Sequence, residues 1–185
     1  MQKNGNSEEI VINKTIKVLC LGDGGVGKTS LIRRFAHNKF EKSYLETLGV
    51  DITDKIVPVG EKDKEKNLKM VIWDIAGQDR YKSYRSAFYQ GTEALIVVAD
   101  VTNPVTFDNL QTWKKEIDQF LGIKLPTIFL ANKCDLQDQR KVMNTEVSQV
   151  GKLLDLNTNQ IFESSALAGL NVNEAFNKLA DLSLG

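Results

Sequence analysis

The sequence predicts an α/β fold: a six-stranded, mostly parallel sheet with one antiparallel strand and helices on both faces. Six short apolar runs alternate with segments of helical periodicity along the 185 residues. Most runs are continuously apolar, which is typical of strands covered on both sides. No repeat or Pro/Gly/Ser-rich linker divides the chain, and 42% hydrophobic residues suffice for one core. We therefore expect a polar, disordered N-terminal arm at residues 1–14 and a single domain at residues 15–185.

The expected strands lie at residues 15–21, 50–59, 67–73, 94–100, 127–131 and 160–163. A helical pattern separates most neighbouring pairs, and strand–helix alternation predicts parallel pairing. The second and third strands are the exception, because only the charged segment GEKDKEKN joins them. These two strands are therefore predicted to form an antiparallel hairpin with a solvated tip.

Several helices have recognisable ends. Asn103 is expected to cap a helix with Pro104 at its first position, and the apolar stripe of that helix continues to Gly122. Another helix is expected to start at Asn144. The last is predicted to begin at Asn171, which forms a capping-box pattern with the glutamate three residues later.

Charge and cysteine content narrow the class of protein. The chain has 24 Lys and Arg and 24 Asp and Glu, so its net charge is zero. A general nucleic-acid binder or a polybasic membrane binder is therefore not expected. Cys20 and Cys134 are expected to be reduced thiols of a cytoplasmic protein, because neither belongs to a metal-binding spacing.

No targeting or membrane-spanning segment is predicted. The polar N-terminus does not resemble a signal peptide, and the longest apolar run, residues 94–99, is too short to cross a bilayer. Neither end contains a lipidation motif, since residue 2 is glutamine and the last residues are DLSLG. We expect a cytoplasmic protein, with peripheral membrane association only if a lipidated tail is missing from this sequence.

The segment GDGGVGKT at residues 22–29 packs four glycines between an expected strand and a helix at residues 31–35. It matches the phosphate-loop pattern G-x-x-x-x-G-K-[ST] in the context that this motif requires. Glycines let backbone N–H groups surround phosphates, and the helix N-terminus adds positive potential. Lys28 is expected to reach the β- and γ-phosphates, and the Thr29 hydroxyl to ligate Mg²⁺. The predicted phosphate-binding residues are Gly22, Asp23, Gly24, Gly25, Val26, Gly27, Lys28, Thr29 and Ser30.

The segment NKCD at residues 132–135 indicates which base is bound. It follows a strand, where loops of α/β sheets bind ligands. The Asp135 carboxylate accepts hydrogen bonds only, which suits the adjacent N1–H and amino donors of guanine and disfavours adenine. Asn132 is expected to tie this loop to the phosphate loop, and the Lys133 stem to lie along the ring. The predicted ligand is therefore GTP or GDP.

The segment WDIAGQ at residues 73–78 ends the third expected strand. Asp74 is expected to hold Mg²⁺ through water, as acidic residues do in phosphate-loop enzymes. Gly77 can offer its N–H to a γ-phosphate. Gln78 is then placed to orient an attacking water molecule, so GTP hydrolysis is the predicted reaction.

These motifs, with ESSAL at residues 163–167, follow the order and spacing of Ras-superfamily small GTPases, which the chain resembles from about residue 15 to 182. The segments TLGVD, WDIAGQDRY and DVTNPVTFDNL are most similar to the Rab branch. The resemblance implies the small G-protein variant of the phosphate-loop fold. It also implies a GTP hydrolase that is slow alone and accelerated by an activating protein.

The resemblance adds site residues that spacing alone does not identify. Thr47 matches the switch I threonine that ligates Mg²⁺ and senses the γ-phosphate, although by itself it reads as an ordinary loop residue. Phe40 matches the aromatic beside guanine, or else is a core residue. Tyr44 matches the tyrosine over the phosphates. The resemblance implies three catalytic residues: Gln78, Lys28 and Thr47. It implies that Thr29, Thr47 and Asp74 ligate the metal. It also implies that the guanine-binding loop consists of Ser165, Ala166 and Leu167.

The resemblance also implies partners. Effectors, an exchange factor and an activating protein are expected to bind switch I, about residues 40–51, and switch II, about residues 76–90. Four aromatic residues of switch II either form such a surface or belong to the core: Tyr81, Tyr84, Phe88 and Tyr89.

Two residues depart from the family pattern. Glu46 precedes Thr47 where many relatives have proline, so the switch I backbone is less preset. Leu167 occupies the position of the lysine in the family's S-A-K motif, so the lysine stem beside the base is replaced.

A scaffold that barely hydrolyses GTP and an ATP-dependent kinase are the alternative functions. Retention of Thr47, Asp74 and Gln78 disfavours the scaffold, and Asp135 disfavours the kinase.

Overall fold

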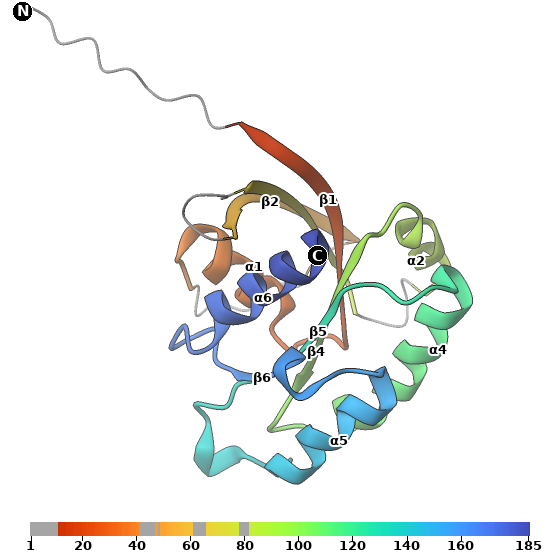
Figure 1. Ribbon diagram of the computed structural model, residues 1–185. Coiled ribbons are helices and arrows are strands. Elements are labelled where there is room, and N and C mark those ends of the chain that lie inside the picture. Colours follow the sequence, from red (N-terminus) through yellow and green to blue (C-terminus); the bar gives the residue numbers. More distant parts are fainter. Residues whose placement is uncertain (1–10, 41–46, 48, 61–65, 78–81) are drawn as a thin grey trace, which may run out of the picture.

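The computed structural model describes residues 11–40, 47, 49–60, 66–77 and 82–185 (Figure 1). Six strands form one sheet in the order β2-β3-β1-β4-β5-β6. Neighbouring strands are parallel except β2 and β3, which form the expected antiparallel pair. The predicted six-stranded α/β fold is therefore confirmed. The strands are β1 (Ile12–Leu21), β2 (Val50–Val59), β3 (Lys66–Ile75), β4 (Ala94–Asp100), β5 (Thr127–Asn132) and β6 (Ile161–Ser164).

Helices cover both faces of the sheet. The α-helices are α1 (Lys28–His37), α2 (Lys82–Tyr89), α3 (Val105–Asp108), α4 (Leu110–Leu121), α5 (Asn144–Leu154) and α6 (Val172–Leu184). Two short 3₁₀ helices, η2 (Gln137–Gln139) and η3 (Thr158–Gln160), lie between them. Figure 1 shows α1 and α6 together on one side of the sheet, and α2, α4 and α5 on the other.

The two faces have separate cores, and β1 contributes to both. Val18 and Cys20 pack in the core under α1 and α6, where the rings of Phe35 and Phe176 stack at 4.1 Å. Leu19 and the following Leu21 pack in the core under α4 and α5. Successive side chains of a strand point to opposite faces, so a strand covered on both sides must be apolar throughout. This explains the continuous apolar runs.

Several element ends differ from the sequence prediction. Strand β1 begins at Ile12, so residues 12–14 belong to the sheet and not to the N-terminal arm; residues 1–10 lie outside the described residues. The helix predicted to begin at Asn103 is two helices, because Asn109 separates α3 from α4, although Gly122 ends α4 as expected. Asn171 does not form the predicted capping box. It has a φ of 55°, and its Nδ2 donates to the carbonyl oxygen of Glu163 instead.

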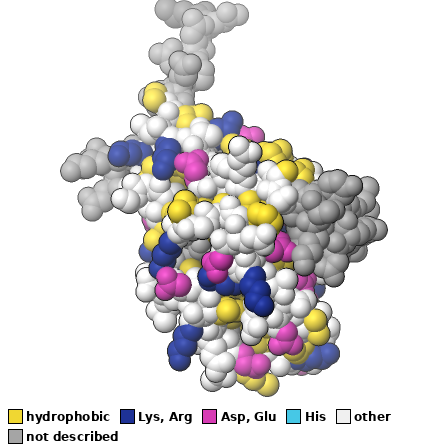
Figure 2. All heavy atoms as spheres, turned by 90° about the vertical axis from the view of Figure 1, so that its right-hand side faces the viewer, with side chains coloured by type: hydrophobic (Ala, Val, Ile, Leu, Met, Phe, Trp, Pro, Cys, Tyr) yellow, Lys and Arg dark blue, Asp and Glu magenta, His cyan; other side chains and the backbone are white. Residues whose placement is uncertain are grey.

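The distribution of surface charge agrees with the zero net charge of the chain, and both cysteines are reduced as expected. Figure 2 shows Lys/Arg and Asp/Glu side chains interspersed with apolar ones on the described part of one face. Cys20 and Cys134 are buried free thiols, and burial raises the pKa of both. Within the described ranges, no helix is both long and apolar enough to cross a membrane.

Candidate active site

The motif loops meet at one edge of the sheet. The segment after β1 carries the phosphate loop, β3 ends next to Gly77, and β5 and β6 end at the NKCD and ESSAL segments. These four strands are parallel, so their carboxyl ends lie on the same edge. In the sheet, β3 lies on one side of β1 and β4 on the other, so the direction in which strands are added changes at β1. Such a change of direction is where open α/β sheets bind ligands.

The phosphate loop requires glycine where other chain segments approach it closely. Gly27 has a φ of 98°, and a Cβ on it would lie 2.3 Å from Nδ2 of Asn132. A Cβ on Gly77 would lie 2.2 Å from the carbonyl oxygen of Gly22. Any side chain at either position would therefore separate the loops, which explains two of the glycines in the sequence motifs.

Lys28 begins α1 and lies inside the loop rather than in solvent, with only 6% of its surface exposed. Its Nζ donates to the carbonyl oxygens of Gly22 and Asp23, at 2.7 and 2.8 Å. The ammonium is thus held within the ring of backbone groups that the sequence predicts around the phosphates.

Three oxygen-bearing side chains from separate elements meet beside this lysine. Thr29 Oγ1 donates to Asp74 Oδ2 and lies 2.9 Å from Thr47 Oγ1. Asp74 is 2% exposed, and its Oδ1 is buried without a hydrogen-bond partner. Burial raises the pKa of Asp74, although the Lys28 charge and the Thr29 hydrogen bond oppose this shift. Among the described residues, the ionised carboxylate therefore has too few hydrogen-bond partners.

These three side chains fit Mg²⁺. Mg²⁺ binds hard oxygen ligands and commonly uses one or two carboxylates together with substrate phosphates. One carboxylate and two hydroxyls converge here, and the unpartnered Asp74 Oδ1 has capacity for a metal-bound water. No group of three or more His, Cys, Asp or Glu able to hold a metal occurs in the described part of the chain. The donor set accordingly suits a metal that the nucleotide helps to hold.

Asn132 links three loops, as the sequence predicts for the phosphate loop. Its Nδ2 donates to the carbonyl oxygen of Val26 at 2.8 Å. Its Oδ1 accepts from the N–H of Ala166 at 3.2 Å and from Ser164 Oγ at 3.4 Å. The side chain is buried, so these bonds are shielded from water. Asn132 thereby fixes the distance between the phosphate loop and the predicted base-binding loops.

The predicted base-binding residues of NKCD lie at the surface beside Asn132. Lys133 has a φ of 67°, and its Nζ forms an ion pair with Asp100 Oδ2 at 2.5 Å. Asp135 is exposed. Asp100 was not predicted as a site residue. Its position at the carboxyl end of β4, opposite Asn132 in the β4–β5 register, was the available signal.

Two backbone N–H groups of the predicted guanine loop donate hydrogen bonds to other groups of the protein. The Ser165 N–H donates to the carbonyl oxygen of Leu170 at 3.2 Å, and the Ala166 N–H donates to Asn132. The role of these N–H groups toward guanine O6 stays a prediction.

The sequence analysis did not predict Arg34 as a site residue. Its Nε and Nη2 donate to the carbonyl oxygens of Ala166 and Leu167 at 2.9 and 2.7 Å. The Leu167 side chain is 46% exposed.

The predicted switch residues are only partly described. Tyr44, Glu46, Gln78 and Tyr81 lie outside the described residues, as does the side chain of Tyr84. Phe40 is half-buried and packs against the core under α1 and α6.

The aromatics at the end of switch II belong largely to the core. Tyr89 is buried, and its hydroxyl donates to Glu116 Oε2 at 3.3 Å. Phe88 is half-buried against the same core, with its ring 6.0 Å from that of Trp73. Of the two alternatives given for these aromatics, a partner-binding surface or the core, Tyr89 therefore belongs to the core.

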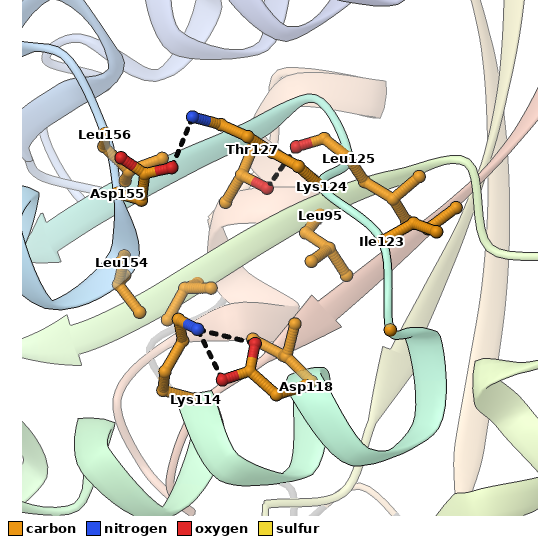
Figure 3. A pocket seen from close by; sticks show the side chains of 13 residues that line it. Leu95, Lys114, Asp118, Ile123, Lys124, Leu125, Thr127, Leu154, Asp155 and Leu156 are labelled. Atoms are coloured by element: carbon orange, nitrogen blue, oxygen red, sulfur yellow. Dashed lines mark hydrogen bonds and ion pairs between the residues drawn. The ribbon is translucent and has the colours of Figure 1, made fainter.

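A cavity of about 370 Å³ lies away from these loops (Figure 3). It is lined by α4, the segment before β5 and the end of α5, and it contains none of the motif residues. Two ion pairs border it, Lys114–Asp118 and Lys124–Asp155. The hydrogen bond from Lys124 lowers the pKa of Asp155. Leu95 and Thr127, at the amino ends of β4 and β5, place the cavity at the opposite end of the strands.

Comparison with known proteins agrees with the geometry. A sequence model of the Ras family matches residues 17–184. The Ras-related protein Rab-13 of Mesocricetus auratus is 40% identical over 164 residues, which cover 89% of this chain and 77% of that protein. The Ras-related protein Rab-10 of Diplobatis ommata and the GTP-binding protein ypt2 of Schizosaccharomyces pombe are 34% and 36% identical over 165 residues, covering 89% of this chain and 79% of each relative. The phosphate-loop motif and the predicted metal and guanine sites lie on one edge of the sheet, and with these matches this chain belongs to the Ras family and is a Rab-like small GTPase, an enzyme that hydrolyses GTP.

Proposed function

We propose that this GTPase is a molecular switch that binds GTP or GDP with Mg²⁺ and recruits effectors in its GTP form, in intracellular membrane traffic or signalling. The observation that carries the proposal is the 2.9 Å contact between Thr47 Oγ1 and Thr29 Oγ1. It brings a residue of switch I to a residue of the phosphate loop. A ligand held by Thr29 therefore acts directly on switch I.

Thr29, Thr47 and Asp74 are the side chains that would hold the metal, Asp74 through water. When bound there, Mg²⁺ would neutralise the negative charge that develops as the phosphates separate. The buried Asp74 carboxylate, which lacks a partner for Oδ1, supports this assignment.

The remaining chemistry is assigned to residues of the chain itself. Lys28 exchanges its bonds to the Gly22 and Asp23 carbonyls for phosphate oxygens, because its ammonium already lies within the loop. Gly77 offers its N–H to the γ-phosphate. Gln78 orients a water molecule whose oxygen attacks the γ-phosphorus, and the bond to the β-phosphate oxygen breaks to give GDP and inorganic phosphate.

Base selection is assigned to the NKCD and ESSAL loops. Asp135 accepts hydrogen bonds from guanine N1–H and the amino group, and its exposed carboxylate supports this role. The Lys133 stem covers one face of the base, and the ion pair with Asp100 limits its movement. Tyr44 and Phe40 retain the positions implied by the family, over the phosphates and near the base.

Switching follows from loss of the γ-phosphate. Thr47 and Gly77 lose their ligand on hydrolysis, and both switch segments change their surfaces. Effectors are expected to bind the ordered surfaces of residues 40–51 and 76–90. An exchange factor and an activating protein are expected to act on the same segments, as in the Rab branch.

The test measures nucleotide identity, hydrolysis and metal dependence on one preparation. The protein is loaded with GTP, and single-turnover formation of GDP is followed with and without EDTA. Slow hydrolysis in Mg²⁺, and faster nucleotide release in EDTA, are expected. Asp74→Ala should abolish the effect of EDTA on release, whereas the distant Asp155→Ala should retain it. Equal release with and without Mg²⁺ in the unmodified protein would reject the proposed metal role, and absence of hydrolysis would favour a nucleotide-dependent scaffold.

A further inference from the structure

The side chain of Asp23, the second residue of the phosphate loop, is bonded to helix α4. Asp23 Oδ2 accepts from Asn109 Nδ2 at 2.7 Å, and Oδ1 accepts from Trp113 Nε1 at 2.8 Å. Asn109 is the N-cap residue of α4 and lies four residues before Trp113, so both donors lie on one side of the start of the helix. One carboxylate oxygen therefore has a donor from the N-cap of α4, and the other has a donor from α4 itself.

These bonds are partly shielded from water. Trp113 is 4% exposed and belongs to the core under α4 and α5, and Asp23 is half-buried. Hydrogen bonds to an ionised group are stronger than neutral ones, and partial burial increases their weight. The two bonds join residues 86 and 90 positions apart in the chain.

The backbone of Asp23 contacts two further parts of the site. Its carbonyl oxygen accepts from Lys28 Nζ at 2.8 Å. A Cβ on Gly77 would lie 2.4 Å from the Asp23 carbonyl carbon, so the turn after β3 packs directly on this peptide. One residue thus connects α4, the phosphate-binding lysine and the start of switch II.

We propose that Asp23 is a positioning residue through which α4 holds the phosphate loop in the conformation that retains the nucleotide diphosphate. Its carboxylate has no direct part in binding the phosphates, because both oxygens are turned to α4. It acts through its own peptide, on which Gly77 packs and whose carbonyl holds Lys28 inside the loop until the ammonium turns to the phosphates. The proposal rests on the proposed nucleotide-binding function and adds α4 to the elements that control nucleotide release.

The chain provides variants of suitable shape. Asp23→Asn keeps the size of the side chain but turns an amide donor toward one of the two α4 donors. Asn109→Leu and Trp113→Phe remove one donor each and leave an apolar group in place. Trp73→Phe is the matched control, because the ring of Trp73 contacts Lys17 and Phe88, and neither belongs to the phosphate loop.

The experiment measures the dissociation rate of a fluorescent GDP analogue and the equilibrium affinities of GDP and GMP. A lost hydrogen bond to a charged group commonly changes an equilibrium tenfold or more. Asp23→Asn is therefore expected to release GDP about tenfold faster, with Trp113→Phe and Asn109→Leu changed in the same direction. Adding Trp113→Phe to Asp23→Asn should have little further effect, because the bond is already broken.

Comparing the losses of GMP and GDP affinity distinguishes a positioning role of Asp23 from a general loosening of the fold. It lacks the β-phosphate that the loop and Lys28 bind, so Asp23→Asn should weaken GMP binding at most about twofold. Unchanged GDP release in both Asp23→Asn and Asn109→Leu, or equal loss of GDP and GMP affinity, would overturn the proposal. If the unmodified protein binds neither nucleotide, the proposed function itself fails. If it retains GDP and the variants match it, only the role of Asp23 fails.

Discussion

Arg34 Nε donates to the carbonyl oxygen of Ala166, 132 residues further along the chain, at a distance of 2.9 Å. The same guanidinium donates from Nη2 to the carbonyl oxygen of Leu167. Helix α1 begins with Lys28, which is predicted to bind phosphate, and carries Arg34 on its last turn. One helix therefore contributes to both ends of the nucleotide site, the phosphate loop at its start and the predicted guanine loop near its end.

Arg34→Lys tests this connection. The lysine ammonium cannot reproduce the planar pair of donors that Arg34 directs at two adjacent carbonyls. We expect a loss of about 1–2 kcal/mol in guanine nucleotide affinity, observed as faster GDP release. Arg34→Met should release GDP at least as fast, because it removes both donors. Equal release from all three proteins would show that Asn132 alone holds the loop.

Leu167→Lys tests the departure from the family motif. The backbone carbonyl of Leu167 is held by Arg34 and its side chain is 46% exposed, so the substitution leaves the loop bonds intact. A longer aliphatic stem covers more of the base, worth about 1 kcal/mol for a few buried methylenes. Stopped-flow release of a fluorescent GDP analogue should slow several-fold, with guanine preference unchanged. Release that is equal or faster would contradict this expectation.

Asp135→Asn tests base selection. The substitution replaces one acceptor oxygen with a donor amide, which opposes the guanine amino group and suits the corresponding oxygen of xanthine. GTP affinity should fall by several kcal/mol, because a site built for hydrogen bonds rejects a mismatched partner strongly. Competition binding should show xanthosine triphosphate preferred over GTP. A retained preference for GTP would refute the role of Asp135.

Asp74→Asn should raise the stability of the folded protein without Mg²⁺ but weaken its response to Mg²⁺. Burial raises the pKa of Asp74 above its ordinary value of 3.8, so ionisation destabilises the folded state. Stability of the unmodified protein falls as the pH rises from 3.8 through the folded pKa, and the cost is complete above that pKa. Without nucleotide or Mg²⁺, the variant should therefore be the more stable at pH 7, by about 1 kcal/mol or more.

Thermal unfolding in EDTA measures this difference, which should shrink as the pH approaches 3.8. Asp155→Asn is the control, because the Lys124 hydrogen bond lowers the pKa of the exposed Asp155 and no gain is expected there. A lower stability of Asp74→Asn at pH 7 would show that Lys28 and Thr29 fully compensate the buried charge.

Hydrolysis by the isolated protein is expected to be slow. No arginine occurs between Glu41 and Asp79, so switch I supplies no internal arginine to stabilise the transition state. In Ras, a partner's arginine raises the rate by roughly 10⁵-fold. Gln78→Leu should reduce the single-turnover rate further while leaving GTP binding unchanged. Rapid hydrolysis that is indifferent to this substitution would exclude the proposed mechanism.

The local patterns predicted the sheet and the motif loops well. Strands at residues 50–59 and 94–100 have the predicted bounds, because apolar runs and flanking breakers are local signals. The hydrogen bonds that join the loops were not predictable in the same way. Arg34, Asp23 and Asp100 find partners on other elements, and only the packing of α1, α4 and β4 brings those partners near. Asn171 shows the reverse case, since it forms no side-chain capping bond and its amide donates to the carbonyl oxygen of Glu163 on the preceding strand.

The antiparallel pairing of β2 with β3 determines where Thr47 can lie. Val50 pairs with Ile75, and the Ala76 N–H donates to the carbonyl oxygen of Gly49 at 2.9 Å, so the ladder extends to the edge of the site. A slip of one residue along this ladder would shift Thr47 by roughly 3.4 Å and turn every β2 side chain to the other face. Thr47 would then lose contact with Thr29. A one-residue insertion or deletion within β2 should therefore separate switch I from the phosphate loop even though every motif residue is retained.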